Sequence, residues 1–201
     1  MDLLHYPTVL NAYLHGGVVE REEVCVEGMS AQVYYVDHES WGSAGQGLAF
    51  SHIILNRARL EDEPDLVHDY VFLHEYGHKQ WFWPLQVFFT IGQASYVLML
   101  ILLGIAVPWK FLEAILTPAS GSVLTTLAGL TIGFTLLIAI PLAVTWFDEG
   151  YAELHAISHV GYSAYLEMLE IHENKSRSLP SRLRSLVMYP PTSLILVISR
   201  R

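Results

Sequence analysis

Two long apolar stretches interrupt a chain that otherwise mixes hydrophobic and polar residues. Residues 80–109 and 114–147 contain neither a charged residue nor a histidine. Within them, residues 85–107 and 123–144 each reach the roughly 20 residues with which a helix crosses a bilayer. Tryptophans stand at the ends of these segments, where aromatic belts form. The pattern predicts a two-helix transmembrane hairpin, with two buried helices of a soluble core as the alternative.

Before residue 84, the hydrophobic residues form shorter patterns, typical of strands and of one helix. Residues 18–27, 31–36 and 48–56 are rich in β-forming residues and predict strands, and the glycine-rich residues 41–47 predict a loop between the last two. A helix is predicted from residue 65 to about 82, because Pro64 and the acidic residues around it suit a helix start.

After the second apolar stretch, residues 148–174 predict a long helix that continues from the second span. Residues 189–192 predict a turn, and residues 193–199 a strand or helix. The elements together predict an α+β fold with a small β-sheet. We expect residues 1–83 to form the first part of a globular domain, residues 84–147 the hairpin, and residues 148–201 the second part of that domain.

Composition narrows the possible functions. The net charge of −9 gives no electrostatic footprint for nucleic acid. Apart from Lys110, the basic residues lie outside the predicted hairpin. The positive-inside rule then places both flanks of the hairpin on the cytoplasmic side of the bilayer. The sequence therefore predicts an integral membrane protein with its globular domain in the cytoplasm.

A His-Glu-x-x-His motif lies in the first predicted helix, at residues 74–78. His74 and His78 are four residues apart, so both imidazoles point the same way and can bind one metal ion. Glu75 is then the candidate general base, which takes a proton from a metal-activated water. Three protein ligands plus a water are typical of a catalytic zinc site.

A second acidic cluster follows the hairpin. Glu149 and Glu153 are four residues apart on one helical face, so Glu149 can supply the third ligand and Glu153 can orient a ligand histidine from behind. Asp148 points about 100° away from Glu149 on a helix, and we expect it to be the helix N-cap. A solvated helix start is the alternative for the two glutamates.

These residues resemble the membrane-bound zinc peptidases of the gluzincin group, in particular the HtpX-type and CAAX prenyl endopeptidase-like families. The likeness covers residues 47–78, the two apolar segments and Glu149-x-x-Ala152-Glu153. Those families place a third zinc ligand, a glutamate, after a transmembrane hairpin. Their second motif has aspartate where this chain has Glu153.

The resemblance implies one zinc ion per chain, held by His74, His78 and Glu149, with Glu75 as the general base. It implies a peptide or protein substrate, associated with the bilayer, that pairs with residues 48–56 as an edge strand. Candidate donors for the oxyanion are His155, His159, Tyr151 and Tyr189. The expected activity is that of an integral-membrane zinc endopeptidase.

Two other functions fit the same motif. One is an intramembrane protease of the site-2 type, in which an aspartate supplies the third ligand. The charged residues of the motif helix disfavour burial in lipid. The other is a membrane sensor or scaffold whose zinc site performs no turnover.

Overall fold

A computed structural model describes residues 10, 12–14, 16–41, 43–47, 52–80, 84, 87, 122–173 and 189–199. The chain forms two compact units, one of residues 1–86 together with 146–201 and the other of residues 87–145. The first unit contains the sheet, the motif helix and the second acidic cluster.

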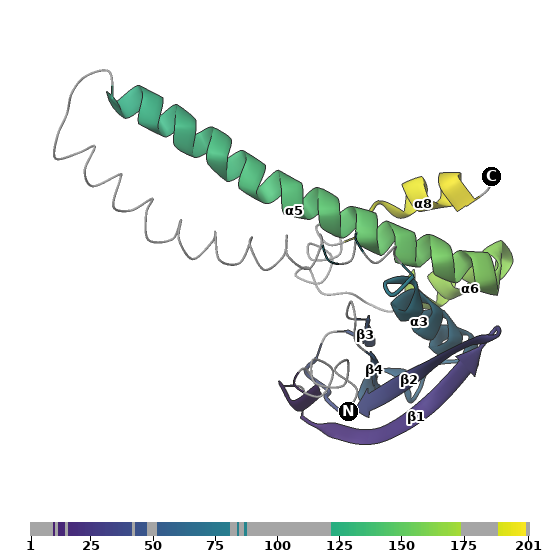
Figure 1. The fold of residues 1–201 in the computed structure, drawn as a ribbon. Coiled ribbons are helices and arrows are strands. Elements are labelled where there is room, and N and C mark those ends of the chain that lie inside the picture. Colours follow the sequence, from purple (N-terminus) through teal and green to yellow (C-terminus); the bar gives the residue numbers. More distant parts are fainter. Residues whose placement is uncertain are drawn as a thin grey trace. The chain divides into compact units, whose positions relative to one another are not determined.

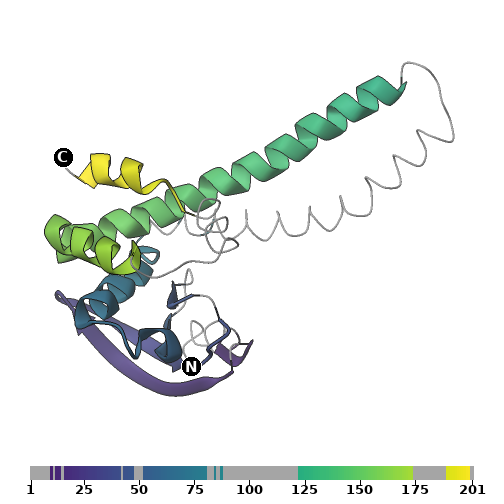
Figure 2. The ribbon, with the colours of Figure 1, turned by 180° about the vertical axis from the view of Figure 1, so that it is seen from behind.

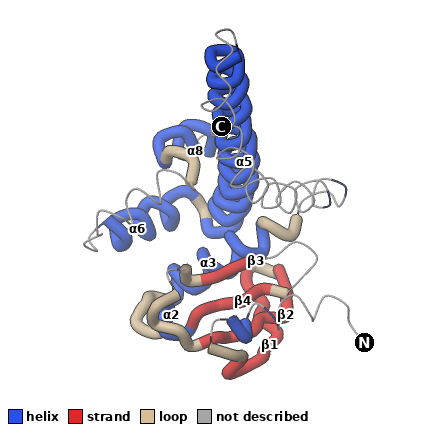
Figure 3. Tube along the Cα trace, turned by 90° about the vertical axis from the view of Figure 1, so that its left-hand side faces the viewer, coloured by secondary structure: helices blue, strands red, loops and turns tan. Residues whose placement is uncertain are grey.

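The sheet of the first unit has four described strands in the order β1-β2-β4-β3 (Figure 1; Figure 3). Strands β1 (Val18–Val26) and β2 (Met29–Val36) pair as an antiparallel hairpin. Its turn residues, Glu27 and Gly28, both have positive φ angles, as a two-residue turn of type I′ requires. These strands confirm the prediction for residues 18–27 and 31–36.

Strand β4 (Ile53–Asn56) lies inside the sheet, parallel to β2 and antiparallel to β3 (Gly45–Gly47). All four residues of β4 are buried, as expected of a strand covered on both faces. The prediction for residues 48–56 is confirmed for the described part, but that strand is internal rather than an edge. Strand β3 is one of the two edge strands of the described sheet, with β1 at the other edge, and it falls in the segment predicted to be a loop.

Buried Asn56, at the end of β4, holds the chain that leads into β3. Its main-chain N–H donates to the carbonyl of Ala44 at 2.8 Å. Its side-chain amide donates to the carbonyl of His38 at 3.0 Å and accepts from the His38 N–H at 3.2 Å. A short helix, α2 (Arg57–Leu60), follows at once.

Helix α3 (Asp65–Gly77) carries the motif and packs against β3 and β4. It begins after Pro64, as predicted, and ends at Gly77, earlier than predicted. The main core lies around this helix. It joins strand residues to side chains of the helices, including Val33, Ile53, Leu55, Phe72, Leu73, Ala156 and Tyr165.

Helix α5 (Ser122–Val160) ends in the first unit, where α6 (Tyr162–Glu173) follows it. Gly161 has a φ of 87°, a left-handed conformation that ends α5 and starts a new direction. Figure 2 shows α6 and the end of α5 beside α3 from behind. Helix α8 (Thr192–Ser199) settles the choice between strand and helix for residues 193–199.

The predicted transmembrane hairpin needs correction. None of the helices among the described residues has both the length and the apolar character needed to cross a membrane. The first predicted span, residues 85–107, lies outside the described residues except for Val87. The second, residues 123–144, lies within α5, which continues into the charged segment that begins at Asp148, as predicted. The α+β class and the small sheet are confirmed.

Candidate metal centre

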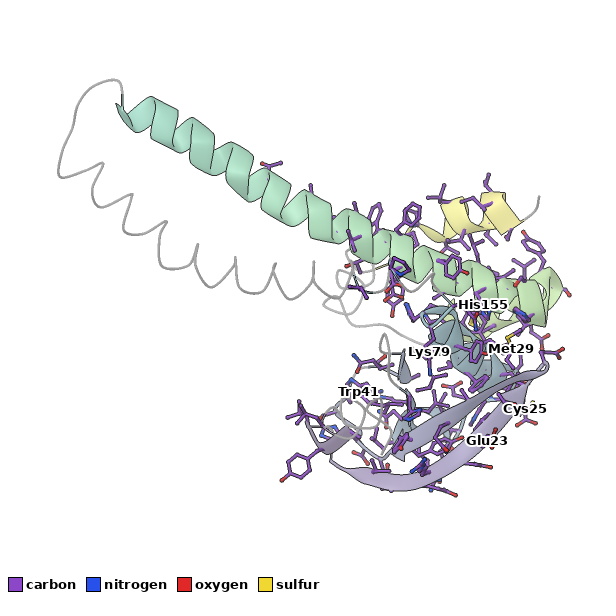
Figure 4. All side chains as sticks on the ribbon, in the orientation of Figure 1. Glu23, Cys25, Met29, Trp41, Lys79 and His155 are labelled. Carbon is purple, nitrogen blue, oxygen red and sulfur yellow. The ribbon has the colours of Figure 1, made fainter. Side chains whose placement is uncertain are left out.

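Helices α3 and α5 cross at Gly77 and Ala152. A Cβ atom added to Gly77 would lie 2.8 Å from Ala152 Cα and 3.0 Å from His155 Cβ. Only a glycine permits this approach, which brings the motif helix against the acidic segment of α5. His155 lies at the same crossing (Figure 4), and its Nδ1 lies 3.1 Å from the carbonyl oxygen of Leu73.

Three side chains from the two helices converge at this crossing. His74, His78 and Glu149 each present one ligand atom, and these atoms lie within 4.8 Å of one another. The Nε2 atoms of His74 and His78 lie 3.3 and 3.9 Å from Glu149 Oε2. The structure therefore brings together the three ligands that the sequence predicted, and the group could hold a metal ion.

The spacing and the donor atoms suit zinc. Ligand atoms at about 2.0–2.2 Å from a tetrahedral ion lie roughly 3.3–3.5 Å apart, close to the separations from Glu149 to the two rings. Among the described residues, the buried Glu149 Oε2 has no hydrogen-bond partner. Since a buried carboxylate oxygen without a partner is costly, a cation at this position would satisfy it. Two imidazoles and one carboxylate also leave a fourth position for water.

Each ligand histidine has a second carboxylate behind it. His74 Nδ1 lies 3.2 Å from Glu153 Oε2, and His78 Nδ1 lies 3.1 Å from Asp148 Oδ2. These pairs lie within ion-pair distance, although the two buried Nδ1 atoms miss strict hydrogen-bond geometry. A carboxylate at Nδ1 favours a proton on that nitrogen and leaves Nε2 for a metal.

Asp148 thus has a different place from the one predicted. It is not an N-cap, because α5 is already helical for many residues before it. Its carboxylate lies near Nδ1 of His78 rather than at the position shared by the three ligand atoms. This placement favours Glu149 over Asp148 as the third ligand.

Two tyrosines support Glu153, and neither was predicted to belong to the site. Tyr165 of α6 donates its hydroxyl to Glu153 Oε1 at 2.7 Å, and buried Tyr70 of α3 lies close enough to help lower the pKa of this carboxylate. Burial and the charge of Glu153 raise the pKa of both tyrosines, which therefore stay protonated donors. Nothing local in the sequence connects Tyr165 to His74.

The charged groups of the site and their burial shift the pKa values of His74, Glu75 and Glu153. Burial alone would lower the pKa of His74, but Glu149 and Glu153 offset this and raise it well above its usual range. Burial raises the pKa of Glu75, and Glu149 adds to the shift, while the two histidines oppose it. The pKa of Glu153 is lowered because His74 and the tyrosines outweigh its burial.

Glu75 lies next to the ligand group, and its side chain is buried. Its Oε2 accepts a hydrogen bond from the main-chain N–H of Gly47 on β3. The other candidate oxyanion donors do not share one location. Tyr151 and Tyr189 are exposed, and His159 Nδ1 lies 2.8 Å from the carbonyl of His155 in its own helix. The geometry therefore assigns no oxyanion donor among them.

Comparison with protein-family models, curated proteins and solved structures finds no match to this chain. The gluzincin resemblance thus stays a prediction that rests on the motif residues.

Proposed function

We propose that this chain is a zinc-dependent endopeptidase that hydrolyses peptide bonds with a metal-activated water. One observation supports the proposal above the others: a buried glutamate, Glu75, lies beside a three-ligand group. Three protein ligands leave the fourth position of a tetrahedral zinc ion to water. The group combines a His-Glu-x-x-His helix with a glutamate from a second helix, the arrangement that the gluzincin resemblance implies.

His74, His78 and Glu149 would hold the zinc ion. A zinc ion there would polarise the substrate carbonyl and lower the pKa of a water molecule. Glu153 and Asp148 keep the two imidazoles oriented through Nδ1.

Glu75 moves the proton. Its carboxylate takes a proton from the attacking water, whose oxygen bonds to the carbonyl carbon. It then passes that proton to the leaving nitrogen as the C–N bond breaks, which yields a carboxylate and an amine. Burial raises the pKa of Glu75 above its ordinary value, which makes this carboxylate a better proton acceptor.

Strand β3 gives the substrate a surface on which to extend. It is an edge strand of the described sheet and the one whose Gly47 bonds Glu75, so a peptide paired with it would pass beside Glu75. Pairing of an extended peptide to a sheet edge is a common mode of peptide recognition.

The test is cleavage of casein by the zinc-loaded protein, compared with Glu75→Gln. We expect Glu75→Gln to bind as much zinc as the wild-type protein and to cleave at least a hundredfold more slowly, because the amide cannot accept the proton. Glu61→Gln, an exposed glutamate after α2, is the matched control and should cleave at the wild-type rate.

Two outcomes would contradict the proposal. If Glu75→Gln cleaved as fast as the wild-type protein, Glu75 would not be the general base. If the fully zinc-loaded protein turned over no peptide, the zinc site would serve a purpose other than hydrolysis.

A further inference from the structure

Strand β3 presents alternate backbone groups to its outer side. The bond from Asn56 N–H to the Ala44 carbonyl, together with the antiparallel register, means that Ala44 and Gln46 bond toward β4. Since alternate residues of an antiparallel ladder face opposite sides, Gly45 and Gly47 direct their N–H and C=O groups outward. These are the groups with which an added strand would pair.

Both outward-facing glycines already make hydrogen bonds within the chain. The N–H of Gly47 donates to the Glu75 carboxylate, and the carbonyl of Gly45 accepts from the Ser43 hydroxyl at 2.6 Å. The candidate general base is therefore bonded to a donor that a paired peptide would need.

The two glycines make this contact possible. A Cβ atom on Gly45 would lie 2.8 Å from Glu75 Cγ and 2.9 Å from Glu75 Oε1, and one on Gly47 would collide with the main-chain oxygen of Glu75. Any side chain at either position would push β3 and α3 apart. The Gly-x-Gly sequence thus keeps Glu75 within reach of the strand edge.

We propose that Glu75 and an extended peptide substrate compete for the Gly47 N–H. Without a peptide, this N–H holds the Glu75 carboxylate against β3. A peptide that pairs with β3 offers a backbone carbonyl in its place and releases the carboxylate to accept a proton from water. The exchange replaces one hydrogen bond by another and makes or breaks no covalent bond. This inference rests on the proposed peptidase function and adds that strand pairing activates the base.

Competition predicts that removal of the carboxylate strengthens peptide binding. Glu75→Ala leaves the Gly47 N–H available to the peptide, whereas Glu75→Gln keeps an amide oxygen that can accept from it. Neither variant should cleave, so binding of an intact peptide can be measured. The probe is a fluorescein-labelled casein fragment that spans a bond cleaved by the wild-type protein, followed by fluorescence anisotropy with zinc-loaded protein.

We expect the fragment to bind Glu75→Ala about threefold to tenfold more tightly than Glu75→Gln, the range of one net hydrogen bond. The tighter binding to Glu75→Ala should vanish for a fragment in which one particular peptide bond is replaced by a carbon–carbon double bond. This replacement removes the carbonyl acceptor. In ¹⁵N-labelled Glu75→Ala, the Gly47 amide proton should shift upfield relative to wild type and return downfield when the fragment is added.

Equal affinity of the two variants, or an advantage that survives every carbonyl replacement, would overturn the competition while leaving the peptidase function intact. A Gly47 amide proton that does not respond to loss of the carboxylate would overturn it too. If the zinc-loaded wild-type protein cleaved no casein bond, the peptidase function itself would fail, and the activation proposal with it.

Discussion

Gly77 and Ala152 pack so closely that no side chain fits between them. A Cβ atom on Gly77 would lie 2.8 Å from Ala152 Cα. Gly77 follows His74 by three residues and Ala152 follows Glu149 by three, so this contact sets the separation of the ligands on the two helices. The metal centre therefore depends on one glycine that makes no bond to it.

Gly77→Ala should damage both stability and zinc binding. Because the added methyl group must push α5 away from α3, we expect a loss of about 1–3 kcal/mol in the free energy of unfolding. A chain of this size should then melt roughly 2–10 °C lower. Zinc content after dialysis should also fall.

Gly133→Ala is the matched control, since a Cβ atom there meets nothing within 4 Å in the part of the chain that the structure describes. It should leave zinc content unchanged and stabilise α5 by up to about 1 kcal/mol. A Gly77→Ala protein with wild-type melting temperature and zinc content would show that the helices do not cross as closely as described.

Zinc should stabilise the folded protein, because an unfolded chain does not assemble the three ligands. At a free zinc concentration about 1,000 times the dissociation constant, the gain is about 4 kcal/mol. Removal of zinc with a chelator should therefore lower the melting temperature of the wild-type protein. His74→Ala and Glu149→Ala should bind little zinc and melt at the same temperature with or without the chelator.

His68→Ala is the control for these ligand variants. It removes a histidine of the same helix whose Nε2 lies 2.7 Å from the carbonyl of Leu60, away from the ligand group. It should retain one zinc ion per chain. Full zinc content in either ligand variant would contradict the assigned site.

The carboxylates behind the histidines should set zinc affinity without binding the ion. Glu153→Gln and Asp148→Asn keep the side-chain shape but lose the charge at Nδ1, and we expect each to weaken zinc binding about 10-fold to 100-fold. Competition with a chromophoric chelator measures the change. Glu167→Gln, an exposed position on α6, should have wild-type affinity. Wild-type affinity in Glu153→Gln would mean that Glu153 does not orient His74.

Tyr165→Phe tests whether the hydroxyl that bonds Glu153 also contributes to zinc affinity. It retains the buried ring but removes the hydroxyl that donates to Glu153 Oε1. We expect a smaller loss of zinc affinity than in Glu153→Gln. In a double variant with Glu153→Gln, the two losses should not add, because both act through one carboxylate. Additive losses would show that Tyr165 affects the site by another route.

Asn56 should matter for β3 rather than for the metal. Asn56→Ala removes the side-chain amide that hydrogen-bonds part-buried main-chain groups of His38, Trp41 and Ser43, at a cost of about 1–3 kcal/mol. We expect unchanged zinc content but slower casein cleavage, since β3 would no longer be held beside Glu75. Loss of zinc together with activity would place Asn56 in support of the metal centre instead.

Several elements could be predicted from local sequence alone. The strands β1 and β2 and the buried β4 have β-forming side chains, and α3 has a proline start and a helical motif, so neighbouring residues suffice to specify them. The ligand types and their spacing in the His-Glu-x-x-His motif have the same local character. Glu149 could be nominated because it lies in a second acidic cluster on a predicted helix.

Other features were predicted wrongly because their cause lies elsewhere in the chain. Strand β3 is Gly-Gln-Gly, which has little β propensity, and it forms because β4 pairs with it and Asn56 holds the residues before it. Asp148 was taken for a helix start, but α5 begins far upstream.

The sequence by itself determined which residues can bind a metal ion and that β1, β2, β4 and α3 form, because side-chain chemistry and periodicity act over a few residues. Only the tertiary structure decided which carboxylate faces which nitrogen, that Tyr165 supports Glu153, and that Gly47 holds Glu75. Those contacts join segments far apart in the chain, and their distances follow from packing at Gly77 and along β3 that no local pattern encodes.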